Sequence, residues 1–212
     1  MFNNYLPQIL ICLGMIFTFF GGAIAFHRNR QSTALIKNLG KSNLDLTQKL
    51  HNQITGGDSF PILNVSIIKQ NNNQLALLTV FNKGKFPLSA VEIYYCDADF
   101  MSQNFPNNNG ELSVEMLTHY RTISLPSIKE NTTTMTQEAV NVQEGKIVRL
   151  SVQLSANSGS FAEELLVAKR DGNLFYAYRI NTIGEKPKIL EEYISPNFPT
   201  DTNGKINWIM NR

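Results

Sequence analysis

Three histidines are the first candidates for metal or acid–base chemistry in this sequence. His27, His51 and His119 lie far apart, and neither an HExxH nor a CxxC pattern accompanies them. Zinc sites draw two or more ligands from such short spacings, and a catalytic histidine is usually recognised by the motif around it. The histidines therefore predict neither a zinc site nor a recognisable general base.

Acidic residues offer the next candidates. Asp97-Ala98-Asp99 brings two carboxylates close in sequence, but a hard cation needs more oxygen ligands than this, so a solvated strand end is the favoured interpretation. Asp201-Thr202-Asn203-Gly204 resembles the opening of a calcium loop, yet its twelfth position is Arg212, where an acid is required. The sequence thus predicts no metal ligands.

Two pairs of adjacent glutamates, Glu163-Glu164 and Glu191-Glu192, fall in or beside predicted strands. Neighbouring strand residues point to opposite faces of a sheet, so neither pair is expected to converge on one site.

Nucleophiles and phosphate-binding loops complete the search. The sequence contains no GxSxG, Walker A or GxGxxG pattern. Its two cysteines are Cys12, inside an apolar run, and Cys96, so no disulfide within the soluble part is expected. We predict no catalytic, cofactor-binding or metal-binding residue and expect that the chain is not an enzyme.

The apolar run itself extends over residues 5–26 and contains no Asp, Glu, Lys or Arg. At 1.5 Å per residue, a helix of this length spans roughly 33 Å, enough for a bilayer core of about 30 Å. A cleaved signal peptide is the rival interpretation, because Ala23-Ile24-Ala25 resembles a cleavage site. The absence of a basic residue in the first four positions favours an uncleaved transmembrane helix.

Basic residues follow this run at Arg28, Arg30, Lys37, Lys41 and Lys49. Because positive residues stay in the cytoplasm, we expect the N-terminus outside and the C-terminal domain on the cytoplasmic side of a bacterial inner membrane. A periplasmic orientation is the alternative. The net charge of +2 gives no reason to expect a nucleic-acid partner.

Residues 28–56 are predicted to form a helical stalk. Ile36, Leu39, Leu46 and Leu50 recur at heptad-like spacing and form what we call the stalk seam. Either a second copy of the chain covers this seam, in a weak homo-oligomer helped by glycines in the apolar run, or the stalk lies against its own domain.

Short segments rich in β-branched and aromatic residues fill the rest of the chain and predict a mainly β domain at residues 57–212. Asp171-Gly172 is a strong two-residue hairpin signal. Seven or more strands with regular turns favour an antiparallel β-sandwich, Ig-like or similar. Expected strands are residues 62–69, 74–82, 90–97, 120–125, 132–137, 148–155, 165–169, 174–180 and 189–194. The expected division is residues 1–27 for the tail and transmembrane helix, 28–56 for the stalk and 57–212 for the sandwich.

Two motifs give the domain a resemblance to other proteins. Gly56-Gly57-Asp58-Ser59-Phe60-Pro61 and Gly84-Lys85-Phe86-Pro87-Leu88 frame the first strand pair. This pattern resembles one in uncharacterised bacterial proteins that place a β-domain beside membrane helices. The resemblance covers about forty residues. It implies a membrane-attached module and no particular activity.

Aromatic residues are the last feature of the predicted strands. Tyr94, Tyr95, Tyr120, Phe175, Tyr176 and Tyr178 are expected to fill the core, with a partner-binding face as the alternative. We expect a non-enzymatic interaction or sensing module on the cytoplasmic membrane face. The alternatives are a hydrolase-like enzyme assembled from distant loops and a periplasmic ligand-binding domain.

Overall fold

The fold was analysed in a computed structural model that describes residues 6–70, 73–104, 118–201 and 204–208. Within helix and strand segments, the side chains of residues 6–9, 12, 70 and 73 are outside the description. The chain divides into two compact units, residues 1–50 and residues 51–212. The sequence had placed this boundary after residue 56.

The first unit is helical. Helix α1 extends over Leu6–Thr55 as one element of 50 residues, so the predicted membrane segment and the predicted stalk belong to a single helix. Among the residues that the structure describes, no stretch of helix combines the length and apolar character needed to cross a membrane. Residue 5 and the side chains of residues 6–9 and 12, all within the expected span, lie outside the described part.

The stalk seam lies on this helix. Its four residues, Ile36, Leu39, Leu46 and Leu50, are 54–69% exposed. What covers the seam stays a prediction, and crosslinking of the full-length chain is the measurement that tests it.

All nine predicted strands are confirmed. Most of the strand ends differ from the expected ones by a few residues. The strands are β1 Phe60–Gln70, β2 Asn73–Lys83, β3 Leu88–Asp97, β4 Arg121–Ile128, β5 Thr133–Val140, β6 Ile147–Ala156, β7 Gly159–Arg170, β8 Asn173–Thr182 and β9 Ile189–Ile194. A short helix that the sequence did not predict, α2 (Ala98–Asn104), follows β3. The hairpin between β7 and β8 turns at Asp171 and Gly172, whose φ angles of 52° and 71° fit the expected type I′ turn.

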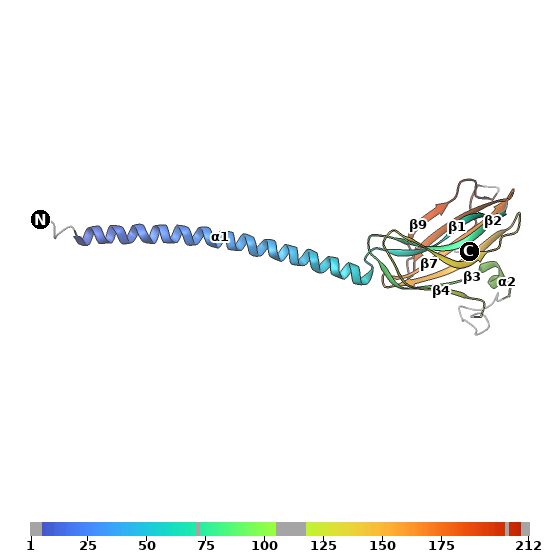
Figure 1. The fold of residues 1–212 in the computed structure, drawn as a ribbon, viewed down its shortest axis with the longest axis horizontal. Coiled ribbons are helices and arrows are strands. Elements are labelled where there is room, and N and C mark those ends of the chain that lie inside the picture. Colours follow the sequence, from blue (N-terminus) through green and yellow to red (C-terminus); the bar gives the residue numbers. More distant parts are fainter. Residues whose placement is uncertain (1–5, 71–72, 105–117, 202–203, 209–212) are drawn as a thin grey trace. The chain divides into compact units, whose positions relative to one another are not determined.

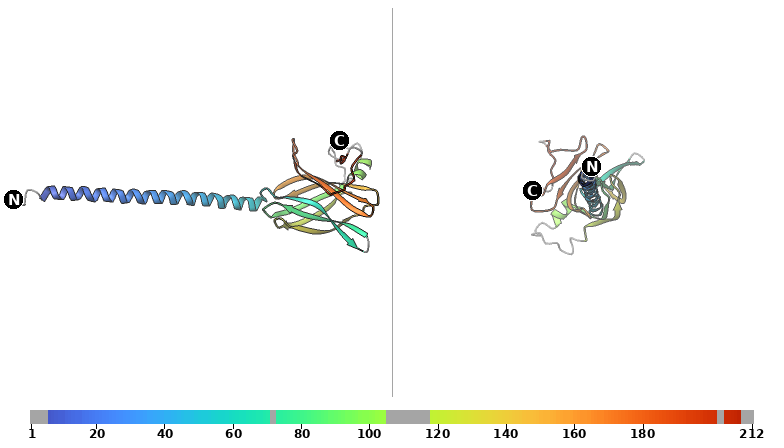
Figure 2. Two further views of the ribbon diagram at one scale, coloured as in Figure 1. Left: turned by 90° about the horizontal axis from the view of Figure 1, so that it is seen from above. Right: turned by 90° about the vertical axis from the view of Figure 1, so that its left-hand side faces the viewer.

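The strands form two antiparallel sheets that face each other (Figure 1, Figure 2). One sheet has three strands in the order β1-β2-β5, and the other has six in the order β4-β3-β6-β7-β8-β9. The mainly β, two-sheet, sandwich-like fold is therefore confirmed. Its division into three and six strands, with β6 to β9 as a simple meander, differs from the immunoglobulin division into four and three.

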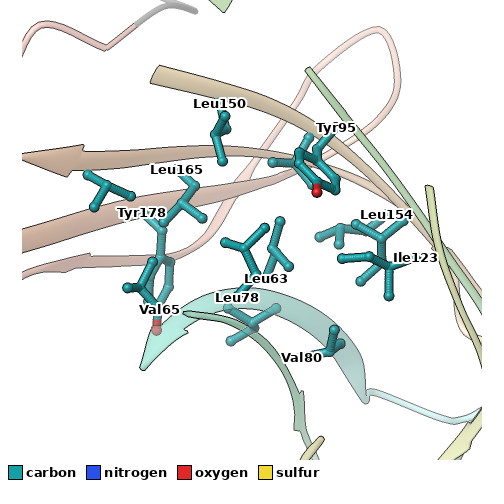
Figure 3. Close-up of a cluster of buried hydrophobic side chains, with 14 of the residues drawn as sticks. Leu63, Val65, Leu78, Val80, Tyr95, Ile123, Leu150, Leu154, Leu165 and Tyr178 are labelled. Atoms are coloured by element: carbon teal, nitrogen blue, oxygen red, sulfur yellow. The ribbon is translucent and has the colours of Figure 1, made fainter. Parts of the chain in front are cut away.

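The main core lies between the two sheets. Leu63 and Leu78 from the small sheet point toward Leu154 and Leu165 of the large sheet, and all four are fully buried (Figure 3). Side chains alternate between the two faces along a strand, so Leu165 faces inward while Leu166, which is also buried, faces outward. Burial of a leucine of this kind stabilises the fold by about 2 kcal/mol.

A second, smaller cluster covers the opposite face of the large sheet. Leu166 and Ala177 lie beneath Phe198 and Trp208, which come from the segment that follows β9. The guanidinium carbon of Arg179 lies 4.5 Å from the centre of the Trp208 ring, a cation–π arrangement. The C-terminal segment is thus packed onto the outer face of the large sheet.

The two glycine-containing motifs of the sequence meet in space. The Ser59 hydroxyl is buried and accepts the backbone N–H of Phe86 at 3.0 Å. Gly57 and Gly84 have φ angles of +55° and +147°, and a Cβ on Gly57 would lie 2.5 Å from the Phe86 ring. Asn82 donates from its amide to the carbonyl of Phe86 at 3.0 Å. The motifs therefore hold the entry into β1 against the turn that joins the end of β2 to the start of β3.

We expect Gly84→Ala to destabilise the domain by several kcal/mol. A Cβ at this position would lie 2.5 Å from the Ser59 Cα, and the φ of +147° is itself strained for alanine. Gly184→Ala is the matched control, because its φ is +157° while nothing lies within 4 Å of the added carbon. Chemical denaturation should show a clearly larger loss for Gly84→Ala. Equal losses for the two variants would show that the packing against Ser59 contributes nothing.

Candidate functional site

A cavity lies at one end of the sandwich, between the two sheets and beside α2. Its volume is about 460 Å³, within the range of sites that bind small molecules. Its lining comes from the end of β3, from α2, from the start of β4, from the end of β5 and from the start of β6. The lining residues are Tyr95, Cys96, Asp97, Phe100, Met101, Thr118, His119, Arg121, Ala139, Val140, Asn141, Val148 and Leu150.

Strand register places two charged side chains of this lining on the inner face of the large sheet. Arg121 pairs with Tyr95 across β4 and β3, and Asp97 pairs with Leu150 across β3 and β6. Directly opposed residues share a face, and Tyr95 and Leu150 both belong to the buried core. Asp97 and Arg121 therefore occupy positions that a closed sandwich would fill with apolar side chains.

Glu138 of β5 joins the two sheets beside the cavity. It accepts hydrogen bonds from the Tyr95 hydroxyl and from Arg121 Nη1, each at 3.1 Å, through the same carboxylate oxygen. Burial, followed by the hydrogen bond to Glu138, raises the pKa of Tyr95 to about 12. The phenol consequently stays protonated at neutral pH and serves as a hydrogen-bond donor.

Asp97 is the last residue of β3 and is exposed, as predicted for a solvated strand end, and α2, which carries Asp99, begins at the next residue. Asp97 Oδ1 accepts the backbone N–H of Phe100 at 3.0 Å, which is the geometry of a helix N-cap. Asp99 forms an ion pair with Arg149 at 2.8 Å. The motif therefore ends a strand, as predicted, and in addition it initiates a helix, because its first aspartate accepts a backbone amide of the first turn.

His119 is the histidine that reaches this cavity, and its ring lies 4.8 Å from the ring of Phe100. His27 and His51 both lie on α1, where His27 Nε2 is 3.0 Å from the Gln31 amide nitrogen. Within the part of the chain that the structure describes, no three His, Cys, Asp or Glu side chains form a group that could hold a metal. The segment 201–204, whose resemblance to a calcium loop the sequence already argues against, includes residues 202 and 203, which lie outside the described residues.

Cys96 is the thiol of the cavity wall. It is buried, and desolvation raises its pKa. Nucleophilic cysteines need the opposite shift, because the thiolate is the reactive species. The thiol is therefore a packing group in this state of the protein.

A second polar cluster lies on the inner face at the other side of the large sheet. Glu163 of β7 is fully buried and accepts the backbone N–H of Leu63 at 2.9 Å through Oε2. β1 is an edge strand of the small sheet, so this N–H has no neighbouring strand to receive it. Oε1 of Glu163 has no hydrogen-bond partner among the described residues.

Glu191 of β9 lies in the same row as Glu163. Both residues pair with Ile180, from opposite sides of β8, and so they share the inner face. Glu191 Oε1 accepts the Tyr178 hydroxyl at 3.1 Å. Its Oε2 lies 2.5 Å from the Lys83 ammonium, an ion pair without hydrogen-bond alignment. We call Glu163 and Glu191 the carboxylate pair.

Burial is the main reason that the pKa of Glu163 lies well above its ordinary value of 4.5, and the neighbouring charge of Glu191 raises the pKa further. The N–H of Leu63 acts in the opposite direction. Desolvation, followed by Glu191, also raises the pKa of Tyr178. The cluster thus favours the protonated form of Glu163, and Lys83 forms an ion pair with the neighbouring Glu191.

Glu163 and Glu164 point to opposite faces of the sheet, as predicted from the sequence, and only Glu163 faces inward. The convergence of Glu163 with Glu191 was not predicted, because it depends on the register of β7, β8 and β9. Of the aromatic residues, Tyr95 and Tyr178 lie in the main core as expected, whereas Tyr94 is 39% exposed. Two tyrosines of the core donate their hydroxyls to glutamates, Tyr95 to Glu138 and Tyr178 to Glu191. The sequence shows these tyrosines on predicted strands but does not show which glutamates they meet.

Comparison with known proteins adds no assignment to this geometry. No family model, no curated protein and no solved structure matches the chain.

We expect Glu163→Gln to reduce the dependence of stability on pH. Because the pKa of Glu163 is raised by folding, the folded state holds a proton that the unfolded state releases above about pH 4.5. The free energy of unfolding of the wild type should therefore fall as the pH rises from that value toward the folded pKa, by up to about 1.4 kcal/mol per pH unit. Glutamine cannot titrate, so the variant should lack this part of the loss.

Urea denaturation between pH 4.5 and pH 8 measures the effect. The difference between the variant and the wild type should shift in favour of the variant as the pH rises. Parallel curves over the whole range would contradict the assignment.

Proposed function

We propose that the chain is a membrane-anchored, non-enzymatic module that binds a partner or senses a ligand through the cavity at the end of its β-domain. The observation that carries this proposal is the placement of Asp97 and Arg121 on inner-face positions, over a floor that includes Val148 and Leu150. The lining combines apolar side chains with converging polar groups, and a concave site of this kind is a usual place for a ligand.

The chemistry of the lining favours binding over catalysis. The described lining holds no serine, and its hydroxyl groups are those of Thr118 and of Tyr95, whose pKa is raised to about 12 by burial and by its hydrogen bond to Glu138. The thiol of Cys96 is held in its protonated form by burial. A hydrolase would need one of these groups to be activated by a neighbouring base.

The proposed anchor is residues 5–26, which carry no Asp, Glu, Lys or Arg. Within the first unit, the large apolar side chains described between Leu10 and Phe26 are all exposed, from 45% to 76%. A helix that is apolar on every side needs an apolar environment, and a lipid bilayer supplies one. The resemblance to membrane-attached bacterial β-domains supports the same proposal.

The proposed orientation follows from Arg28 and Arg30, which come directly after the apolar run. Basic residues are retained in the cytoplasm, which places the β-domain on the cytoplasmic face of the inner membrane. Protease added to intact spheroplasts should leave the β-domain whole and degrade it only after lysis. Digestion of the domain in intact spheroplasts would overturn this orientation and support the periplasmic alternative.

The binding proposal is tested by filling the cavity. Val148→Phe adds a ring to the floor, and Ser127→Phe places the same ring on an exposed position of β4 outside the cavity. If the cavity carries the function, partners captured with the tagged full-length protein from membranes should be lost with Val148→Phe and retained with Ser127→Phe. Equal capture by both variants, at equal thermal stability, would show that the cavity is not the binding site.

A further inference from the structure

The charges around the cavity do not cancel. Asp97 is an exposed carboxylate of the lining and forms no ion pair with any described residue. Arg121, the cation of the lining, is already paired with Glu138 at 3.1 Å. The remaining pair beside the cavity, Arg149 and Asp99, is neutral as a unit. Among the described carboxylates and guanidinium groups around the cavity, one negative charge, that of Asp97, therefore remains for a bound molecule to meet.

Asp97 is held in a fixed position by the fold. Its Oδ1 accepts the Phe100 N–H at 3.0 Å, so the carboxylate is anchored at the first turn of α2. The second oxygen, Oδ2, forms no hydrogen bond with a described residue and is the group that an ammonium donor can reach. Charge-assisted hydrogen bonds of this kind are about twice as strong as neutral ones.

Arg121 disfavours the opposite choice of ligand. An anion that approached its guanidinium would compete with Glu138, which also holds the Tyr95 hydroxyl through the same oxygen. The anion would in addition meet the unpaired carboxylate of Asp97. Electrostatic complementarity at this cavity therefore selects against anions.

The rest of the lining suits an apolar body with a flat face. Leu150 and Met101 are buried apolar side chains of the wall, and the Phe100 ring is 41% exposed. This ring lies 4.8 Å from the ring of His119, so two rings lie beside each other in the lining. An aromatic ring attracts a cation to its face and stacks on another ring.

From these observations we infer that the cavity binds a small organic cation, a protonated amine attached to an aromatic or branched apolar body. The ammonium donates to Asp97, and the apolar body packs on Phe100, Val148 and Leu150. This inference rests on the proposed binding function and names the ligand class of the same site.

Three probes that share one ring and differ in their head group test the inference: 2-phenylethylammonium, neutral 2-phenylethanol and 3-phenylpropionate. Calorimetric titration of the full-length protein in detergent, with protein-free detergent as the blank, measures their affinities. The cation should bind about tenfold more tightly than the alcohol, the ratio expected for one charge-assisted hydrogen bond, and the anion should bind most weakly.

Two variants assign the effect to residues. Asp97→Asn should remove the tenfold preference for the cation, while Asp171→Asn, at the exposed β7–β8 turn, should leave it unchanged. Phe100→Ala should weaken all three probes, because each carries the ring.

Each of the other outcomes would reject an organic cation as the ligand, and the outcomes can be told apart. Equal affinities for the three probes, all reduced by Phe100→Ala, would leave a binding cavity with no charge preference. Tighter binding of the anion would assign recognition to Arg121. Binding of no probe, together with loss of captured partners in Val148→Phe, would reject the amine while the binding function stands.

Discussion

A sheet of three strands covers the inner face of a sheet of six, and this mismatch is the constraint on which the rest of the domain depends. At about 4.8 Å between strands, the small sheet is roughly 14 Å wide and the large one roughly 29 Å. Apolar contact between the sheets therefore closes only the middle of the inner face, where the main core lies. The two margins of the large sheet must be completed by other means.

Each margin is completed differently. Near the β8–β9 margin, Glu163 of β7 reaches the unpaired edge of β1 and accepts the Leu63 N–H. A buried carboxyl is costly, and the fold reduces this cost by raising its pKa and by placing Lys83 near Glu191. At the β3–β4 margin the space is not filled to the same degree, and the cavity with Asp97 and Arg121 results.

The sequence predicts the strands well and their arrangement poorly, for one physical reason. Alternation of side chains along a strand is local, so β6, with Leu150 and Leu154 facing inward, is evident from the sequence alone. The order of strands in a sheet depends on contacts between distant residues, such as that of Glu163 with Leu63, which leave no local signal. The same limit explains why the convergence of Glu163 with Glu191 was not foreseen.

The candidate cavity was reached from the sequence only in part. Asp97 and His119 were singled out as polar residues near strand ends, and both line the cavity. The helix that carries Phe100 was missed, because a seven-residue segment is too short for a helical period to stand out and Asp97-Ala98-Asp99 suited a turn equally well. Arg121 was not considered, since its inward direction follows only from its pairing with Tyr95.

The packing of Trp208 gives the molecule a built-in optical reporter. It is the single tryptophan of the chain, it is buried, and it lies against the Arg179 guanidinium on the outer face of the large sheet. Its emission should therefore be that of a shielded indole and should shift to longer wavelength when the C-terminal segment detaches. The cavity lies on the other side of the sheet. Ligand binding in the cavity should therefore leave the emission of Trp208 unchanged.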